Sequence, residues 1–211
     1  MSDKSTSASY PVSLTVDYPE KDLNRLTSVF RFVLIVPIAV ILILVSGPSW
    51  DSAKEAWRFP FAVGGIVFLP TVLMLLFRWK YPRWWFDWNL NLSKFGLRVA
   101  AYFWLLTDGY PSTDEEQTVH LTMKYPEVTK ELKVGLPLVK WFLAIPHYFV
   151  LAFLFVGVVG AVIISWFAIL FTARYPRGLF DFVVGVMRWG VRVSAYAFLL
   201  VTDVYPPFSM D

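Results

Sequence analysis

The sequence predicts a mainly α-helical, polytopic membrane protein built from two parallel tandem repeats. Of its 211 residues, 57% are apolar, 18% are aromatic and only 17% are charged, whereas a soluble domain carries about 25% charged residues. Long stretches of the sequence recur in the same order, and each copy shows the same succession of hydrophobic patterns. In each copy we expect a short β-strand, a transmembrane helical hairpin and an amphipathic interfacial helix.

Residue usage excludes several classes of chemistry. The chain has no cysteine and only two histidines, so it offers no disulfide, no thiol nucleophile and no cysteine-ligated metal site. The net charge of +3 is typical of a membrane protein whose basic residues gather on one side. We therefore expect no cofactor, no metal and no nucleic-acid partner.

The internal repeat fixes the predicted domain boundaries. Residues 81–88 return as residues 175–182, and residues 12–20 return as residues 119–127. Within the intervening apolar stretches, Arg31 aligns with Lys140. The first repeat then covers residues 11–111 and the second covers residues 118–208, with a disordered terminus at residues 1–10 and an acidic linker at residues 112–117.

Each repeat begins with a predicted strand, at residues 12–18 and 119–125. Apolar and polar residues alternate in both segments, which is typical of a strand with one buried face. Pro19 and Pro126 end them, because proline cannot donate a hydrogen bond to a sheet. Since an isolated strand is unstable, we expect the two strands to pair with each other or with another subunit, forming a small cytoplasmic sheet.

Apolar segments after each strand predict the membrane spans. Their length approaches the roughly 17 to 25 residues that cross the hydrocarbon core. In the second repeat the apolar run is continuous, so we place a tight turn near residues 157–160; a single tilted span after an interfacial helix is the alternative. The predicted spans are residues 29–45, 61–77, 137–156 and 158–173.

Basic residues indicate the topology. Only Lys54 and Arg58 lie in the polar loop at residues 46–60, between the first two spans. Two hairpins would place all other basic residues on one face, as the positive-inside rule expects. Both termini are then cytoplasmic.

An amphipathic helix is predicted after the second span of each repeat, at residues 83–107 and 177–202. Polar residues recur at spacings of three and four, which is a helical period with a narrow polar stripe. Such a helix is suited to the cytoplasmic headgroup layer. The charged stripe consists of Arg83, Asp87, Lys94 and Arg98 in the first repeat and of Arg177, Asp181, Arg188 and Arg192 in the second.

Like charges within this stripe require an anion. Lys94 and Arg98 are four residues apart, as are Arg188 and Arg192, so each pair lies on one helix face. Candidate partners are lipid phosphates or the repeated carboxylates of the chain itself. These cations either extend to water or pair internally, or they bind anionic lipid headgroups. The candidate carboxylates are Glu20, Glu127, Asp108 and Asp203.

One family resembles this pattern. The order Tyr-Pro-Arg-x-x-Phe-Asp, then Arg-Val-x-Ala-Tyr, then Thr-Asp-x-Tyr-Pro occurs at residues 81–111 and 175–208. It is similar to the bacterial membrane family catalogued as domain of unknown function 4389. The resemblance implies a multi-pass protein of the bacterial inner membrane and transfers no catalytic residue.

Catalytic motifs are absent from the sequence. It contains no His-Glu-x-x-His, no phosphate-binding glycine loop and no Gly-x-Ser-x-Gly. His147 lies in a predicted span, but Ile38 takes its place in the first repeat, so we expect a structural histidine. We predict a non-enzymatic membrane scaffold or accessory protein that self-associates, interacts with lipid and has an unknown protein partner. An oligomeric channel or transporter subunit is the alternative.

Overall fold

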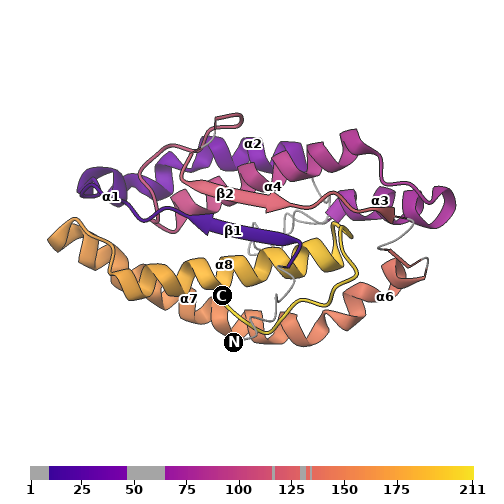
Figure 1. The fold of residues 1–211 in the computed structure, drawn as a ribbon. Coiled ribbons are helices and arrows are strands. Elements are labelled where there is room, and N and C mark those ends of the chain that lie inside the picture. Colours follow the sequence, from indigo (N-terminus) through magenta and orange to yellow (C-terminus); the bar gives the residue numbers. More distant parts are fainter. Residues whose placement is uncertain (1–9, 47–64, 116, 129–131, 134) are drawn as a thin grey trace, which may run out of the picture.

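The computed structural model describes residues 10–46, 65–115, 117–128, 132–133 and 135–211. Within them the protein is mainly helical, with one small antiparallel sheet. Figure 1 shows the two strands crossing the face turned toward the viewer, with α2 and α4 on one side and α7 and α8 on the other. In chain order the elements are β1 (Val12–Val16), α1 (Arg25–Leu34), α2 (Val36–Ser46), α3 (Gly65–Arg78), α4 (Arg83–Phe103), β2 (Val119–Met123), α6 (Leu136–Leu143), α7 (Ile145–Thr172) and α8 (Arg177–Ala197).

The predicted strands pair with each other. β1 and β2 are antiparallel, and Leu14 lies opposite Leu121. Both leucines are buried, while the Ser13 and Thr122 hydroxyls are 2.6 Å apart on the exposed face. The alternation in the sequence therefore predicted correctly which face of the sheet is covered.

Proline interrupts the first apolar helix of each half at the same place. α1 ends before Ile35 and α6 ends before Ala144, and the next helix carries Pro37 or Pro146 in its first turn. Proline has no N–H and its ring clashes with the preceding turn. Each predicted first span is therefore two helical pieces, not one straight helix.

The turn predicted at residues 157–160 is wrong. α7 is one helix of 28 residues that runs through Gly157 and Gly160, so the predicted spans at residues 137–156 and 158–173 are not a hairpin. The open alternative, one long helix after a short one, agrees with α6 and α7. Glycine lowers helix propensity by only about 1 kcal/mol, which an otherwise strongly apolar helix tolerates.

α4 and α8 form as predicted but are covered by protein. They end at Phe103 and Ala197, and the chain then turns through Leu105 and Leu200, which both have positive φ. Instead of facing the headgroup layer, the apolar faces of both helices pack into the core. The buried aromatic residues of these helices are Phe86, Phe95, Tyr102, Phe180, Trp189 and Tyr196.

The two halves pack crosswise. β1 lies against α8 and β2 lies against α4, so each strand covers the long helix of the other half. The Tyr18 hydroxyl donates to the Tyr175 carbonyl at 2.5 Å, and the Tyr125 hydroxyl donates to the Tyr81 carbonyl. α1 of the first half contacts α7 of the second, and α6 of the second half contacts α3 of the first.

Two helical stretches are long and apolar enough to cross a membrane among the residues that the structure describes. They are Arg25–Ile43 and Leu136–Thr172, with 19 and 37 residues. Only 22% of the most apolar window in each is buried, so neither is the covered core helix of a globular domain. The predicted disordered terminus at residues 1–10 falls almost wholly outside the described residues, as does the polar loop at residues 46–60.

Candidate functional site

A buried arginine sits in the first apolar helix. Arg31 on α1 is 1% exposed. Its guanidinium donates to the carbonyls of Tyr102 and Thr107 at 2.9 and 2.6 Å and forms an ion pair with Asp108. The guanidinium carbon also lies 4.4 Å from the centre of the Tyr102 ring. These contacts replace the water that the charge loses on burial.

A buried lysine occupies the aligned position of the second half. Lys140 on α6 is fully buried, and its ammonium donates to the Thr202 carbonyl at 2.7 Å. The Lys140 nitrogen lies 2.6 Å from the Asp203 carboxylate and 5.2 Å from the centre of the Tyr196 ring. Each cation is therefore surrounded by an equivalent set of groups: a threonine carbonyl, an aspartate carboxylate and a tyrosine ring.

Asp108 and Asp203 each have a second role. The backbone N–H of Asn24 donates to Asp108 at 2.6 Å, and that of Lys133 donates to Asp203 at 2.7 Å. Each carboxylate thus joins the turn after α4 or α8 to the chain that enters α1 or α6. The sequence offered these carboxylates as candidate partners of the charged stripe, alongside lipid phosphates; in the structure they pair with Arg31 and Lys140.

Sequence reasoning missed both buried cations as site residues. The available signal was that Arg31 and Lys140 align, each inside an apolar stretch where charge is rare. Their partners lie 77 and about 60 residues away along the chain, at separations that hydrophobic periodicity does not report. The repeated Thr-Asp ends of the two halves were visible but were considered only as possible partners of the charged stripe.

Three arginines of the charged stripe are bonded within the protein. Arg98 donates to the Ser112 carbonyl at 3.0 Å. Arg188 donates to the Leu14 carbonyl on β1 and to the Met210 carbonyl, each at 2.9 Å. Arg192 donates to carbonyls at the end of the described chain, Ser209 and Asp211, and burial lowers its pKa, as does the neighbouring charge of Arg188. Internal bonding thus accounts for these three cations.

The remaining stripe residues lie nearer to the surface. Arg177 and Asp181 are exposed and 3.7 Å apart, as their spacing of four predicts. Arg83 lies over the Tyr125 ring at 4.9 Å, just as Arg177 lies over Tyr18 at 4.5 Å. Two further stripe residues are Asp87, which is exposed, and Lys94, which is half-buried.

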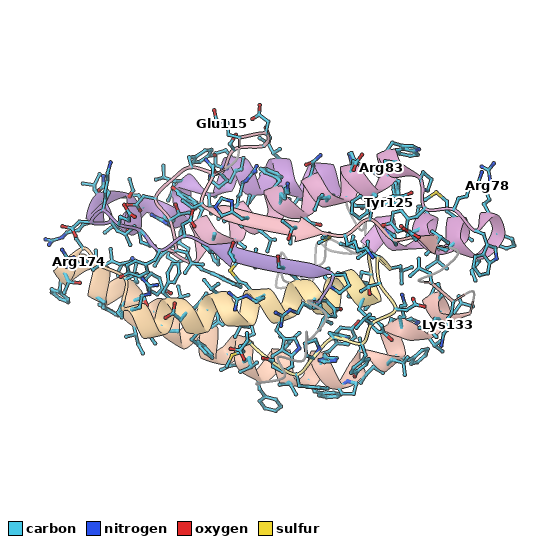
Figure 2. All side chains as sticks on the ribbon, in the orientation of Figure 1. Arg78, Arg83, Glu115, Tyr125, Lys133 and Arg174 are labelled. Carbon is cyan, nitrogen blue, oxygen red and sulfur yellow. The ribbon has the colours of Figure 1, made fainter. Side chains whose placement is uncertain are left out.

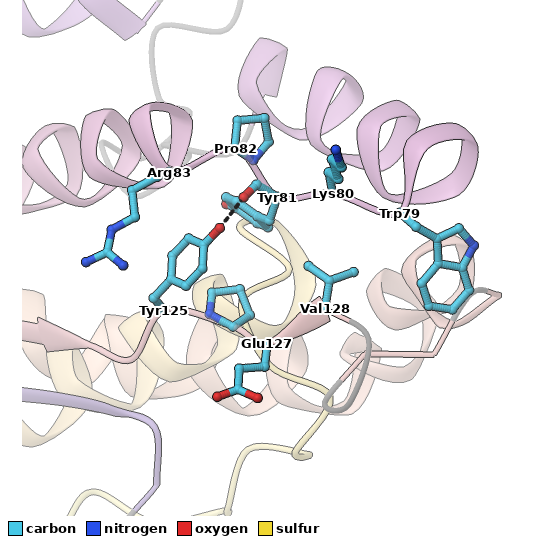
Figure 3. Close-up of a pocket in the computed structure, with 9 residues that line it drawn as sticks. Trp79, Lys80, Tyr81, Pro82, Arg83, Tyr125, Glu127 and Val128 are labelled. Carbon is cyan, nitrogen blue, oxygen red and sulfur yellow. Dashed lines mark hydrogen bonds between the residues drawn. The ribbon is translucent and has the colours of Figure 1, made fainter.

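A pocket of about 500 Å³ opens where α3 turns into α4. Figure 3 shows Tyr125 bonded to Tyr81 at its floor, with the side chains of Lys80, Arg83 and Glu127 diverging around it. Trp79 forms one wall and has a φ of 50°, a left-handed conformation that is costly for a bulky residue. The pocket therefore combines aromatic walls with a mainly cationic rim. Its residues are Trp79, Lys80, Tyr81, Pro82, Arg83, Tyr125, Pro126, Glu127 and Val128.

Two predicted carboxylates lie at the ends of the strands. Glu127 is exposed on the rim of this pocket, and Glu20 is exposed at the matching place in the other half. Near Glu20 the Arg174 guanidinium donates to Asp22 at 2.9 Å. The bonds described above for Arg98, Arg188 and Arg192 go to backbone carbonyls and not to these glutamates.

His147 is enclosed by aromatic rings. It is fully buried, and its Nδ1 accepts a hydrogen bond from the Trp189 indole at 3.0 Å. Phe208 stacks on the imidazole with centres 4.0 Å apart. This environment agrees with a structural histidine. Among the described residues, no group of three or more His, Cys, Asp or Glu could hold a metal ion.

This architecture defines a mainly helical protein with two candidate membrane-spanning helices and a small sheet. Residues 137–210 match the model of the family described as Domain of unknown function (DUF4389). The resemblance of the second half to that family is thereby supported, and the match does not extend to residues 81–111. No curated protein and no solved structure matches the chain significantly.

Proposed function

We propose that the protein is a non-enzymatic membrane scaffold or accessory protein. It binds lipid through the exposed apolar faces of α1, α2 and α7, called here the outer helices, and through its exposed basic residues. The observation that carries this proposal is the exposure of the two candidate spans. A buried helix of a soluble protein would hide most of its apolar side chains, whereas only 22% of either window is buried.

Large apolar side chains project from these helices. Phe153 and Phe171 on α7 are 79% and 78% exposed, and Phe32 on α1 is 65% exposed. A contiguous apolar surface of this kind marks a membrane or protein interaction site. Lipid suits it because the exposed faces continue along nearly the whole of α1, α2 and α7. Further exposed members are Phe30, Val33, Val36, Val40, Ile43, Phe149, Val156, Ile163, Ile164 and Phe167.

The proposal includes duplication of one structural unit. Matching contacts support it: the two buried cations, the two tyrosine hydroxyl bonds and the two arginines that lie over tyrosine rings occur at aligned positions. The residues with positive φ also fall in aligned pairs, Trp79 with Ala173 and Leu105 with Leu200.

We further propose a bacterial inner-membrane location with both described ends of the chain on the cytoplasmic side. This choice follows the resemblance of the sequence pattern to a bacterial membrane family. β1 pairs with β2, so the strands that begin the two halves lie on the same side of the membrane. Self-association and a protein partner remain part of the proposal.

Lipid binding is testable by stabilisation. A ligand that binds only the folded state raises its melting temperature, so phosphatidylglycerol added to detergent-solubilised protein should raise the Tm more than phosphatidylcholine does. The double variant Lys80→Gln/Arg83→Gln should lose that difference, because each removed cation weakens attraction to an anionic headgroup roughly fivefold.

The matched control is Asp87→Asn, which removes an exposed charge of the opposite sign on the same helix. It should keep or increase the preference for phosphatidylglycerol. Equal Tm shifts with both lipids in the unchanged protein would contradict the lipid part of the proposal.

A further inference from the structure

Basic side chains lie at both ends of the long axis of the molecule, each set with a carboxylate nearby: Asp22, which pairs with Arg174, at one end and Glu127 at the other. Figure 2 shows Arg78 and Lys133 at one end and Arg174 at the other. Arg83 begins α4, on the same side of the molecule as Arg78. At the far end Arg25 donates to the Phe171 carbonyl at 3.2 Å, which places it beside Arg174. α1 lies at one end of the molecule and α3 and α6 lie at the other, and α7 runs along the length between the two ends (Figure 1).

Polar surface lies between these ends. The exposed face of the sheet carries Ser13, Thr15 and Thr122, and Figure 1 shows both strands running alongside the long helices. β1 packs on α8, and α8 packs on α7. If α7 crossed the bilayer along the long axis, this polar face would lie at the depth of the hydrocarbon.

Both features oppose a crossing orientation. A polar sheet face and its open edges are not tolerated against lipid. A crossing would also place basic residues on both sides of the membrane, Arg78 and Lys133 on one and Arg174 on the other, whereas Lys and Arg gather on the cytoplasmic side. An orientation parallel to the membrane avoids both costs, because the basic ends and the sheet then face the same aqueous compartment.

We propose that the protein lies with its long axis in the membrane plane and embeds the outer faces of α1, α2 and α7 in a single leaflet. This inference rests on the proposed membrane function. The lipid surface is its partner: acyl chains cover the exposed apolar side chains, and anionic headgroups meet the basic residues at both ends. α7 then acts as an immersed helix and not as a span.

Sidedness of labelling tests this orientation. The chain has no cysteine, so single cysteines can be introduced as Lys80→Cys and Arg174→Cys at the two ends. Inside-out and right-side-out membrane vesicles are treated with a membrane-impermeant maleimide. Both variants should react in the same vesicle preparation, at least tenfold faster than in the other, and Thr15→Cys on the sheet should follow them.

Reaction of Lys80→Cys and Arg174→Cys in opposite preparations would overturn the in-plane orientation while leaving membrane insertion intact. If alkaline carbonate instead released the protein from the vesicles, the proposed membrane function would itself fail. Both variants alter exposed side chains. Arg174 loses an ion pair with Asp22 in which both partners are exposed, and such pairs contribute little to stability. Neither substitution should therefore prevent folding.

Discussion

At the residue scale, Arg31 and Lys140 show how charge is accommodated inside an apolar protein. Each cation is fully covered, but its carboxylate partner keeps 28% or 14% of its side chain exposed. The carboxylate side of each pair is thus partly uncovered, and backbone carbonyls complete the shell of the cation. Removal of one partner from such a pair is costly because a buried charge is left uncompensated.

Asp203→Asn should therefore lower the free energy of unfolding by about 3 kcal/mol. The neutral amide cannot balance the ammonium of Lys140, which has no access to water. Denaturant unfolding of the detergent-solubilised protein measures the change. Asp181→Asn is the control, because its pair with Arg177 is exposed and should be worth less than about 1 kcal/mol; equal losses in the two variants would contradict the assigned role.

Tyr175 predicts a stability change at high pH. It is 1% exposed, and burial raises its pKa to about 12 from an unfolded value of about 10. Between these pH values the unfolded chain loses the phenol proton and the folded protein keeps it. The contribution of Tyr175 to the free energy of unfolding should therefore be fully present below pH 10. It should fall by about 2 kcal/mol as the pH rises to 12.

The isosteric variant Tyr175→Phe isolates this contribution. Unfolding free energies measured at intervals from pH 9 to 12 should fall less steeply for Tyr175→Phe than for the unchanged protein, because the other tyrosines contribute equally to both. Parallel curves would show that the phenol of Tyr175 titrates normally.

At the element scale, the second half shows what an apolar run conceals. Apolar residues fill most positions from Leu136 to Thr172, and the few polar ones set no helical or strand period, so periodicity cannot distinguish two short spans from one long helix. Gly157 and Gly160 suggested a turn, yet both have helical backbone in α7. The amphipathic helices and the strands were predictable, because in both the polar residues recur with the period of the element.

Gly160→Ala tests the continuity of α7. A Cβ at Gly160 meets no atom within 4 Å, so alanine should stabilise the helix by about 0.5 to 1 kcal/mol. Gly157→Ala is the matched variant, because its Cβ would lie 3.2 Å from the Phe182 ring and part of the gain would be lost to that contact. Thermal unfolding measures both, and destabilisation by Gly160→Ala would indicate a turn.

The pattern of α4 and α8 also shows the limit of an amphipathic signal. A wide apolar face with a narrow polar stripe indicates that the helix is covered by an apolar environment. It does not state whether lipid or another part of the chain does so. Here β2 covers α4, and β1 and α7 cover α8. That each strand covers the helix of the opposite half became evident only from the fold.

At the scale of the whole molecule, surface composition separates into two regions. The outer helices carry exposed aromatic and branched side chains, while the uncovered face of the sheet carries the hydroxyls of Ser13, Thr15 and Thr122 together with His120. The excess of apolar residues in the sequence indicated a lipid environment, but which helices would meet lipid depended on packing. Trp104, which directly follows α4, and Trp189 on α8 are buried in the core, so the tryptophans of these segments are not all interfacial residues.

Accessibility of single cysteines in membranes tests most directly whether the outer helices lie in lipid. Phe153→Cys replaces a side chain that is 79% exposed on α7, and Thr15→Cys lies on the exposed face of the sheet. In permeabilised membrane vesicles, a membrane-impermeant maleimide should label Thr15→Cys rapidly and should reach Phe153→Cys only after denaturation in detergent. Labelling of Phe153→Cys as fast as Thr15→Cys would show that α7 faces water and would contradict membrane insertion.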